Sequence, residues 1–162
     1  MRQVSLCLLI KENEGLITEI LLAMKKRGFG QGRWNGVGGK PDTEKGETVF
    51  DSVIRETEEE IGVKIKNPEK AAIIDFYFPE HKKQNDQQVH LFLVKDWEGE
   101  PQETEEMKPQ WFERDIIPFD EMWDDDKHWL PHILEGKRLK AKFFFNENDK
   151  VVNREIEIVE FL

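Results

Sequence analysis

The chain has 162 residues, of which 38% are hydrophobic and 10% aromatic, so it can form one domain with an apolar core and is not wholly disordered. Its 34 acidic and 24 basic residues give a formal net charge of −10, which argues against binding polymeric nucleic acid or membranes through net charge. The single cysteine, Cys7, excludes an intramolecular disulfide and a cysteine-rich zinc site, and it fits a reducing compartment.

The N-terminal third predicts two strands followed by a loop. Val4–Ile10 and Thr18–Met24 are apolar runs of strand length, separated by polar residues. The longest N-terminal apolar run, Leu6–Ile10, is too short for a signal peptide or a membrane span, so we expect a cytoplasmic protein. Six glycines between Gly28 and Gly39 are too many for regular structure and predict a loop.

The rest of the chain predicts two helices among further strands. The first helix is expected from Thr48 to Ile61, with Thr48 as N-cap, Asp51 three residues on and Gly62 as its end. The later elements expected in chain order are strands at 72–78, 88–94 and 110–112, a helix at 126–135, and strands at 142–145 and 150–160. Many strands with two well-separated helices predict an α/β fold, in which a mixed sheet is covered by helices.

The first predicted helix has two distinct faces at 100° per residue. The stripe expected to face the sheet consists of Phe50, Ile54, Thr57 and Ile61. Glu56, Glu59 and Glu60 fall together on another side, where three carboxylates repel one another unless a cation lies between them. Ligation by oxygen alone suits hard cations such as Mg²⁺ or Mn²⁺. Arg55 is four residues before Glu59 and could orient it.

The surroundings of this helix decide between two interpretations of its acidic face. On this feature alone, a solvated acidic surface is the simpler interpretation. The helix, however, follows a flexible loop with Gly38–Gly39, and that loop follows the basic run Lys25–Arg27. Carboxylates, flexible backbone and local positive charge together indicate a phosphate ester complexed with a divalent cation.

Residues 39–63 resemble the Nudix box. The family pattern is Gly-x5-Glu-x7-Arg-Glu-U-x-Glu-Glu-x-Gly-U, where U is a bulky aliphatic residue, and the match consists of Gly39, Glu47 and the segment Arg55–Val63. From Glu47 onward the spacing matches throughout. The chain departs from the pattern in two ways: the interval from Gly39 to Glu47 is two residues longer, and Thr57 occupies one U position.

Three segments outside the box are similar to the MutT-homologue branch of the family, the oxidised purine nucleoside triphosphatases. These segments are Met24–Gly36, Glu106–Phe112 and Ile117–Asp126. The resemblance implies one Nudix domain over residues 1–162, with an α/β/α sandwich fold. It implies Mg²⁺-dependent hydrolysis of oxidised purine nucleoside triphosphates, such as 8-oxo-dGTP and 2-oxo-dATP, to the monophosphate and pyrophosphate. Such an enzyme would cleanse the nucleotide pool, and we expect a monomer.

The resemblance also implies roles for individual residues. The metal ligands would be the Gly38 carbonyl, Glu56, Glu59, Glu60 and Glu106. Glu59 would be the preferred general base, and Arg55 would hold its carboxylate in place. The residues expected to contact the substrate are Ser5, Lys25, Phe29, Asn35, Val37, Gly38, Gly39, Lys40, Phe76, Trp123, Asp124, Asp125 and Asp126. Of these, Lys25 and Lys40 would lie near the phosphates, and Trp123 would stack on the base.

Several alternatives remain open from the sequence. Asp124–Asp126 precede a predicted helix, where acidic residues also serve as caps, and Asn35 also fits a simple turn. The enzyme could act on another modified or ordinary nucleoside triphosphate. A nucleotide-binding sensor without turnover is favoured only by the longer interval before Glu47, and an acidic interaction module does not explain the ordered motif.

Overall fold

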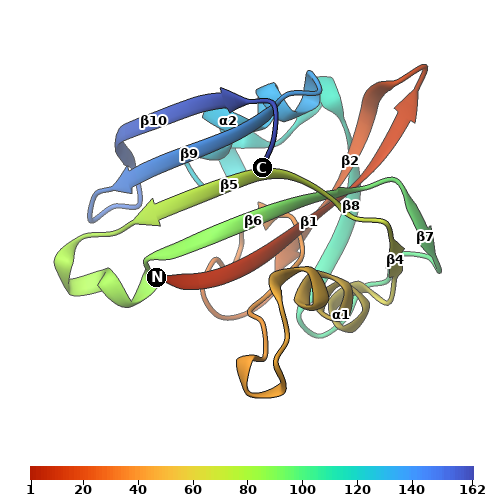
Figure 1. Cartoon of the computed structure of the whole chain (residues 1–162), viewed down its shortest axis with the longest axis horizontal. Helices are drawn as coiled ribbons and strands as arrows, with labels where there is room; N and C mark the ends of the chain where they lie inside the picture. Colours follow the sequence, from red (N-terminus) through yellow and green to blue (C-terminus); the bar gives the residue numbers. More distant parts are fainter.

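The computed structural model describes residues 1–162 and contains one large mixed sheet with a helix on each face (Figure 1). The strands of this sheet are β1 (Arg2–Asn13), β2 (Leu16–Lys25), β3 (Trp34–Asn35), β5 (Glu69–Tyr77), β6 (Gln87–Val94), β8 (Met107–Glu113), β9 (Arg138–Phe145) and β10 (Val151–Val159). Their spatial order is β10-β9-β5-β6-β1-β2-β3, and β8 also pairs with β2. The pairs β1–β6 and β5–β9 are parallel, and the other pairs are antiparallel.

The two helices are α1 (Val49–Ile61) and α2 (Asp126–Leu134). Both lie where the sequence predicts them, and the predicted α/β sandwich with a mixed sheet is confirmed. Three short strands were not predicted: β3, and the pair β4 (Lys64–Lys66) and β7 (Asp96–Glu98), which forms a separate ribbon. Two or three residues carry too little alternation of apolar and polar side chains to identify a strand.

The start of α1 is held by a capping box. The Thr48 hydroxyl accepts a hydrogen bond from the Asp51 backbone N–H at 3.1 Å, and the Asp51 carboxylate accepts one from the Thr48 N–H at 3.0 Å. The two bonds satisfy backbone donors that the first turn of a helix leaves free. Gly62, in the left-handed conformation with φ 74°, ends the helix as predicted.

The predicted inward stripe of α1 is only partly correct. Thr57 and Ile61 are buried as expected, but Val53 is buried with them and Phe50 is 45% exposed. Val53, Thr57 and Ile61 are spaced four residues apart, so the helix rests on this row and is rotated away from Phe50. The Phe50 ring instead lies at the edge of the helix, with its centroid 6.1 Å from that of Phe92.

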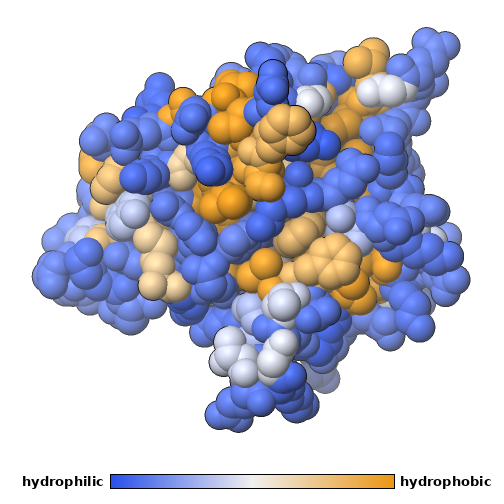
Figure 2. Space-filling view, viewed as in Figure 1, coloured by the Kyte–Doolittle hydropathy of each residue, from blue (hydrophilic) through white to orange (hydrophobic).

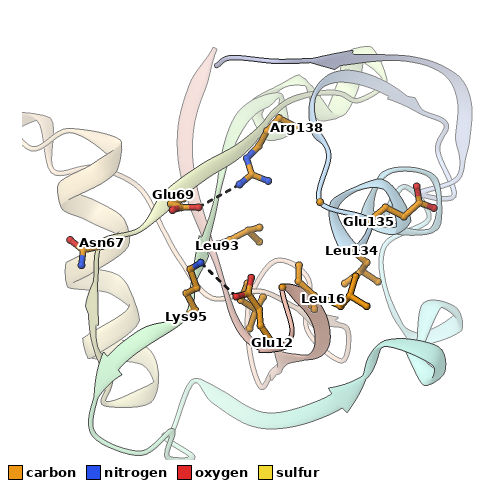
Figure 3. Close-up of a pocket in the computed structure, with 13 residues that line it drawn as sticks. Glu12, Leu16, Asn67, Glu69, Leu93, Lys95, Leu134, Glu135 and Arg138 are labelled. Carbon is orange, nitrogen blue, oxygen red and sulfur yellow. Dashed lines mark hydrogen bonds and ion pairs between the residues drawn. The ribbon is translucent and has the colours of Figure 1, made fainter.

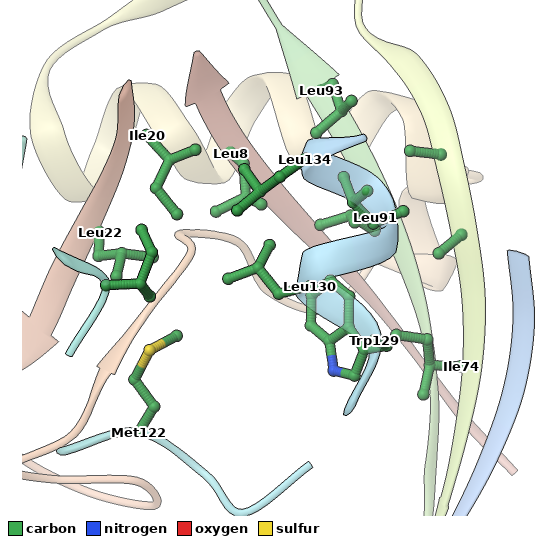
Figure 4. Packing of buried hydrophobic residues seen from close by; sticks show 14 of the residues in the cluster. Leu8, Ile20, Leu22, Ile74, Leu91, Leu93, Met122, Trp129, Leu130 and Leu134 are labelled. Atoms are coloured by element: carbon green, nitrogen blue, oxygen red, sulfur yellow. The ribbon is translucent and has the colours of Figure 1, made fainter. Parts of the chain in front are cut away.

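The sheet separates two hydrophobic cores. On one face α1 packs over side chains such as Cys7 and Leu9 of β1. On the other face α2 contributes Trp129 and Leu130, which Figure 4 shows turned toward the sheet around Leu91. Successive residues of a strand point to opposite faces, so β1 supplies side chains to both cores.

The outer surface is mostly polar. Figure 2 shows hydrophilic side chains over most of one face, with smaller groups of apolar side chains among them. Neither helix is long and apolar enough to span a membrane.

A glycine-rich loop runs directly against β1, and the contact leaves no room for a side chain at Gly38 or Gly39. The Cys7 N–H donates to the Val37 carbonyl at 2.6 Å, and the Ser5 N–H donates to the Gly39 carbonyl at 2.8 Å. A Cβ atom on Gly38 would lie 1.9 Å from the Ser5 carbonyl oxygen, and one on Gly39 would lie 2.4 Å from the Glu56 carboxyl carbon. The glycines therefore allow a close approach of the loop to both β1 and α1.

We expect Gly38→Ala to destabilise the fold by more than about 3 kcal/mol, because the added methyl group collides with backbone that cannot move aside. Gly15→Ala is the matched control: a Cβ atom there meets nothing within 4 Å, and only the positive φ of 80° opposes it, at about 1 kcal/mol. Urea denaturation of both variants measures the difference. Equal losses of stability in the two variants would contradict the close-approach argument.

Candidate functional site

Arg55 of α1 is the centre of a network of carboxylates. Its Nε and Nη2 donate to the two oxygens of Glu47 at 2.7 and 2.8 Å, so this pair is bidentate. Its Nη1 donates to Glu56 at 3.0 Å and to Glu59 at 3.1 Å. The Arg55 guanidinium also donates to the Lys40 carbonyl at 3.1 Å. One arginine thus ties the glycine-rich loop to the acidic face of α1.

The two extra residues before Glu47 form a compact turn. Thr43–Lys45 is a 3₁₀ turn, and the Asp42 carbonyl accepts from the N–H groups of both Lys45 and Glu47. The Glu47 carboxylate accepts from the Asp42 N–H at 2.9 Å. Its hydrogen bonds from Arg55 lower the pKa of Glu47 to about 2. The longer loop therefore leaves the contact between Glu47 and Arg55 intact.

Glu56 and Glu60 are carboxylates in a partly desolvated position. Burial raises the pKa of Glu60 to about 7, although its Oε2 accepts a 3.2 Å hydrogen bond from the Gly38 N–H. Burial also raises the pKa of Glu56, even with Arg55 beside it. Glu59 differs, because 59% of its side chain is exposed. Two partly buried carboxyl groups side by side are a suitable environment for a cation.

The residues of this face fit a divalent metal ion by their chemistry. Glu56, Glu59, Glu60 and the Gly38 carbonyl offer only oxygen atoms, which hard cations prefer. In the structure, however, no three acidic side chains converge closely enough to hold an ion by themselves, because Glu56 and Glu59 both turn to Arg55. Glu106, the fifth expected ligand, pairs instead with Arg27 at 2.9 Å.

The expected basic run divides into paired and free residues. Lys26 forms an ion pair with Glu103, and Arg27 pairs with Glu106. Lys25 has no ion-pair partner, and its charge acts on the Glu60 carboxyl. Lys40 is exposed at the end of the glycine-rich loop. Lys25 and Lys40 are therefore the cations of this region that remain available to an anion.

A separate, small apolar pocket of about 40 Å³ opens on the α2 side of the sheet. It is lined by Phe29, Phe76, Phe78, Gln87, Trp123, Asp125 and Phe145. The ring centroids of Phe29 and Trp123 are 5.1 Å apart at an interplanar angle of 38°. Aromatic walls with two polar groups are typical of a site for a flat heterocycle.

The acidic run before α2 is not a set of helix caps. Asp125 has helical backbone angles, and its Oδ2 accepts a 2.7 Å hydrogen bond from Trp129 Nε1. Asp125 and Asp126 are both 3% exposed, and burial raises the pKa of Asp125 to about 7 and that of Asp126 well above its usual value. Asp124 instead accepts from the Val151 N–H at 2.9 Å and anchors β10.

Three further expected substrate residues, Ser5, Asn35 and Val37, do not line this pocket. Ser5 points to the α1 side, where Ser52 donates to its hydroxyl at 3.0 Å and the Gly39 carbonyl accepts from it at 3.1 Å. The Asn35 side chain accepts from the Gly36 N–H at 2.8 Å. Val37 is buried in the core under α1. These residues shape the loop between the acidic helix and the pocket.

Three residues near the pocket were not predicted. Phe78 and Gln87 line it, and Arg33 lies over the Trp123 ring at 3.9 Å from the centroid. Arg33 also pairs with Asp149 at 3.4 Å, which holds the guanidinium against the indole. Only the pairing of strands far apart in the sequence brings these residues together. The alternation of apolar residues in their strands was visible, but not which ones share a pocket.

A second pocket lies at the other end of the sheet and offers fewer unpaired polar groups to a ligand. Figure 3 shows that its cations already have partners: Lys95 pairs with Glu12 at 3.6 Å and Arg138 with Glu69 at 3.5 Å. Neither of the two buried side-chain nitrogens that lack a hydrogen-bond partner belongs to it. The acidic face of α1 and the aromatic pocket therefore form the candidate site.

Comparisons with known proteins agree with this geometry. A sequence profile of the NUDIX domain matches residues 1–133. The chain is 45% identical over 143 residues to the oxidized purine nucleoside triphosphate hydrolase of Danio rerio, covering 88% of this chain and 89% of that protein. It is 42% identical over 141 residues to the Mus musculus protein of the same name, covering 87% and 88%. Among solved structures, the MutT protein from Bacillus halodurans superposes with a TM-score of 0.81 at 27% identity, covering 97% and 98%.

The buried carboxyl group of Asp125 predicts a pH-dependent stability. The folded state raises its pKa from 3.8 to about 7, so it favours the protonated form. The stability that this proton contributes is complete below pH 4 and is lost as the pH rises through 7. We expect the free energy of unfolding of the wild type, minus that of Asp125→Asn, to fall by about 1 kcal/mol per pH unit across this interval.

Urea denaturation between pH 4.5 and pH 7.5 measures this difference. Asp120→Asn is the control, because Asp120 is exposed and its removal should leave the pH profile of the wild type unchanged. Parallel profiles for the wild type and Asp125→Asn would show that Asp125 ionises normally in the folded protein.

Proposed function

The chain belongs to the Nudix hydrolase family, and from this premise we propose that it hydrolyses oxidised purine nucleoside triphosphates to the monophosphate and pyrophosphate. The relatives from fish and mouse carry that activity in their names. The observation that carries the proposal is the aromatic pocket, whose lining includes the buried Asp125, next in the chain to the buried Asp126. We infer that the reaction removes damaged nucleotides from the pool in the cytoplasm, and that the enzyme acts as a monomer.

The pocket supports recognition of an oxidised purine base. Two adjacent buried carboxyl groups cannot both ionise cheaply, so at least one of them is protonated. The pair then offers both a hydrogen-bond donor and an acceptor to the edge of the base. Phe29 and Trp123 supply the aromatic surfaces on which the ring stacks. Oxidation of a purine exchanges donors and acceptors along its edges, and a site of this kind responds to that exchange.

Nudix hydrolases generally need a divalent cation, and we propose Mg²⁺, with Mn²⁺ as a substitute. Glu56, Glu59, Glu60 and the Gly38 carbonyl would hold it, and Glu106 would need to leave Arg27 to join them. When bound, the ion neutralises phosphate charge and activates water. Arg55 orients the Glu59 carboxylate, which we propose as the general base, and Lys25 and Lys40 attract the phosphates.

The remaining expected substrate residues lie in the pocket wall, in the glycine-rich loop and beside it. Phe76 forms a wall of the pocket, while Val37, Gly38 and Gly39 would guide the substrate between pocket and helix. Ser5, Asn35 and Asp124 act through the backbone they hold rather than through the base. The alternative of a sensor without turnover loses its one favourable feature, because the longer loop keeps Glu47 on Arg55.

The substrate proposal predicts a preference that can be measured directly. With Mg²⁺ present, kcat/KM for 8-oxo-dGTP and 2-oxo-dATP should exceed that for dGTP and dATP by about 10-fold or more, because the buried carboxyl pair discriminates by hydrogen bonding. Pyrophosphate release from the four nucleotides gives the ratio. Equal turnover of all four would keep the Nudix chemistry and overturn the proposed substrate class.

If the acidic face of α1 holds the cation, a variant there should lose nucleotide hydrolysis and keep nucleotide binding. We expect Glu56→Gln to lower kcat by about 100-fold or more, because it removes a partly buried carboxylate from the cation site. Its affinity for 8-oxo-dGMP without metal should stay within about twofold of the wild type, since the pocket lies on the other face of the sheet.

Glu58→Gln is the matched control, because this exposed carboxylate lies on the same helix and makes no ion pair. It should retain full turnover. Equal activity of the Glu56 and Glu58 variants would remove Glu56 from the reaction.

A further inference from the structure

Three residues from neighbouring strands form a row across the sheet beside the aromatic pocket. Gln87 is the register partner of Phe76 on β5 and of Arg2 on β1. Register partners in a sheet point to the same face, so all three side chains lie on the α2 side. Phe76 and Gln87 line the pocket, and Arg2 lies next to Gln87 on the side away from Phe76.

Arg2 determines which way the Gln87 amide points. Its Nη2 donates to Gln87 Oε1 at 2.9 Å. Arginine has only donors, so the amide oxygen must face Arg2 and the amide nitrogen must face away from it. No protein group accepts a hydrogen bond from Gln87 Nε2. The pocket therefore has a hydrogen-bond donor of defined orientation in its wall.

The same pair contains a second unused donor. Arg2 Nε is buried and has no hydrogen-bond partner, one of only two such side-chain atoms in the chain. A buried donor without an acceptor is unfavourable, so the bond from Arg2 Nη2 to Gln87 is the one side-chain hydrogen bond that holds this guanidinium. The only other polar side chain that lines the pocket is Asp125, which comes from the start of α2. The Gln87 amide from β6 and the Asp125 carboxyl group thus belong to two different elements that line the pocket.

We propose that Gln87 is a specificity-determining residue of the base pocket, whose amide N–H donates to a carbonyl oxygen of the bound purine, and that Arg2 is the residue that positions this amide. The inference rests on the proposed function and narrows it: of the two oxidised substrates, 8-oxo-dGTP, with a carbonyl group at C6, should be preferred over 2-oxo-dATP, with an amino group there. A base with an amino group at that position would direct a donor against the Gln87 donor. Such a base binds less well, because neither group finds an acceptor.

Two variants of Gln87 test the donor. Gln87→Glu keeps an oxygen for Arg2 but replaces the N–H donor with an acceptor, and Gln87→Met removes both polar atoms. We expect the KM for 8-oxo-dGTP and dITP to rise by about 10-fold in Gln87→Glu, with kcat within about twofold of the wild type. Hypoxanthine has a carbonyl group where adenine has an amino group, so the ratio of kcat/KM for dITP over dATP should fall in both variants.

Gln88→Glu is the matched control for the charge change. Gln88 is the next residue of β6, points to the opposite face and donates to Asp75 at 2.8 Å. It should leave the dITP to dATP ratio unchanged. The affinity of 8-oxo-dGMP, measured by calorimetry without metal, is a second readout that is independent of turnover, and it should weaken in both Gln87 variants only.

The positioning role of Arg2 is tested by rescue and by a double-mutant cycle. Arg2→Met should lower the dITP to dATP ratio, while Arg2→Lys should restore it, because lysine can also donate to Gln87 Oε1. Arg2→Met should add nothing further in the Gln87→Met background. Additive effects would mean that Arg2 acts independently of Gln87 and would overturn its positioning role.

The outcomes separate this inference from the proposed function. Unchanged KM values and ratios in both Gln87 variants, with an active wild type, would overturn the inference alone. A wild type that hydrolyses dITP and dATP but not 8-oxo-dGTP would overturn the proposed substrate class, while the carbonyl comparison would still test Gln87. A wild type that neither hydrolyses nor binds any of these nucleotides would overturn both.

Discussion

The candidate site depends on the close approach of the glycine-rich loop to β1. Without side chains at Gly38 and Gly39, the loop backbone bonds to β1 on one side and meets Glu56 and Glu60 of α1 on the other. This contact places a carbonyl, an N–H group and two carboxylates in one small region. Arg55 then fixes the same loop from the far side through Glu47. Backbone proximity, rather than any single charge, is therefore the condition that assembles the acidic face.

The two faces of the sheet carry different kinds of side chain. Carboxylates and loop backbone gather on the α1 side, while aromatic rings and the buried pair Asp125 and Asp126 gather on the α2 side. Strand β1 contributes to both faces, since Ser5 supports the loop and Arg2 supports Gln87 in the pocket wall. Under the proposed function, the α1 side would handle the phosphates and the α2 side would recognise the base.

Local signals in the sequence predict the helices and strands well. Contacts between segments that are far apart in the sequence cannot be predicted from such signals. The capping box of α1, its glycine end and its acidic face follow from residues within a few positions of each other. The rotation of α1 that exposes Phe50 depends on how the helix rests on the sheet, which periodicity alone does not determine. Gln87 and Arg2 are 85 positions apart, and only the parallel pairing of β1 with β6 brings them together. Ser5 has a suitable hydroxyl group, but strand alternation turns it toward α1.

The two hydrophobic cores lie on opposite faces of the sheet and share no buried side chain. Residues on the α2 face can therefore be exchanged during evolution without repacking the layer beneath the acidic helix. Under the proposed function, substitutions in the wall of the aromatic pocket would change the base preference without disturbing the carboxylates on the other face. A protein arranged in this way can diversify its substrates faster than its chemistry.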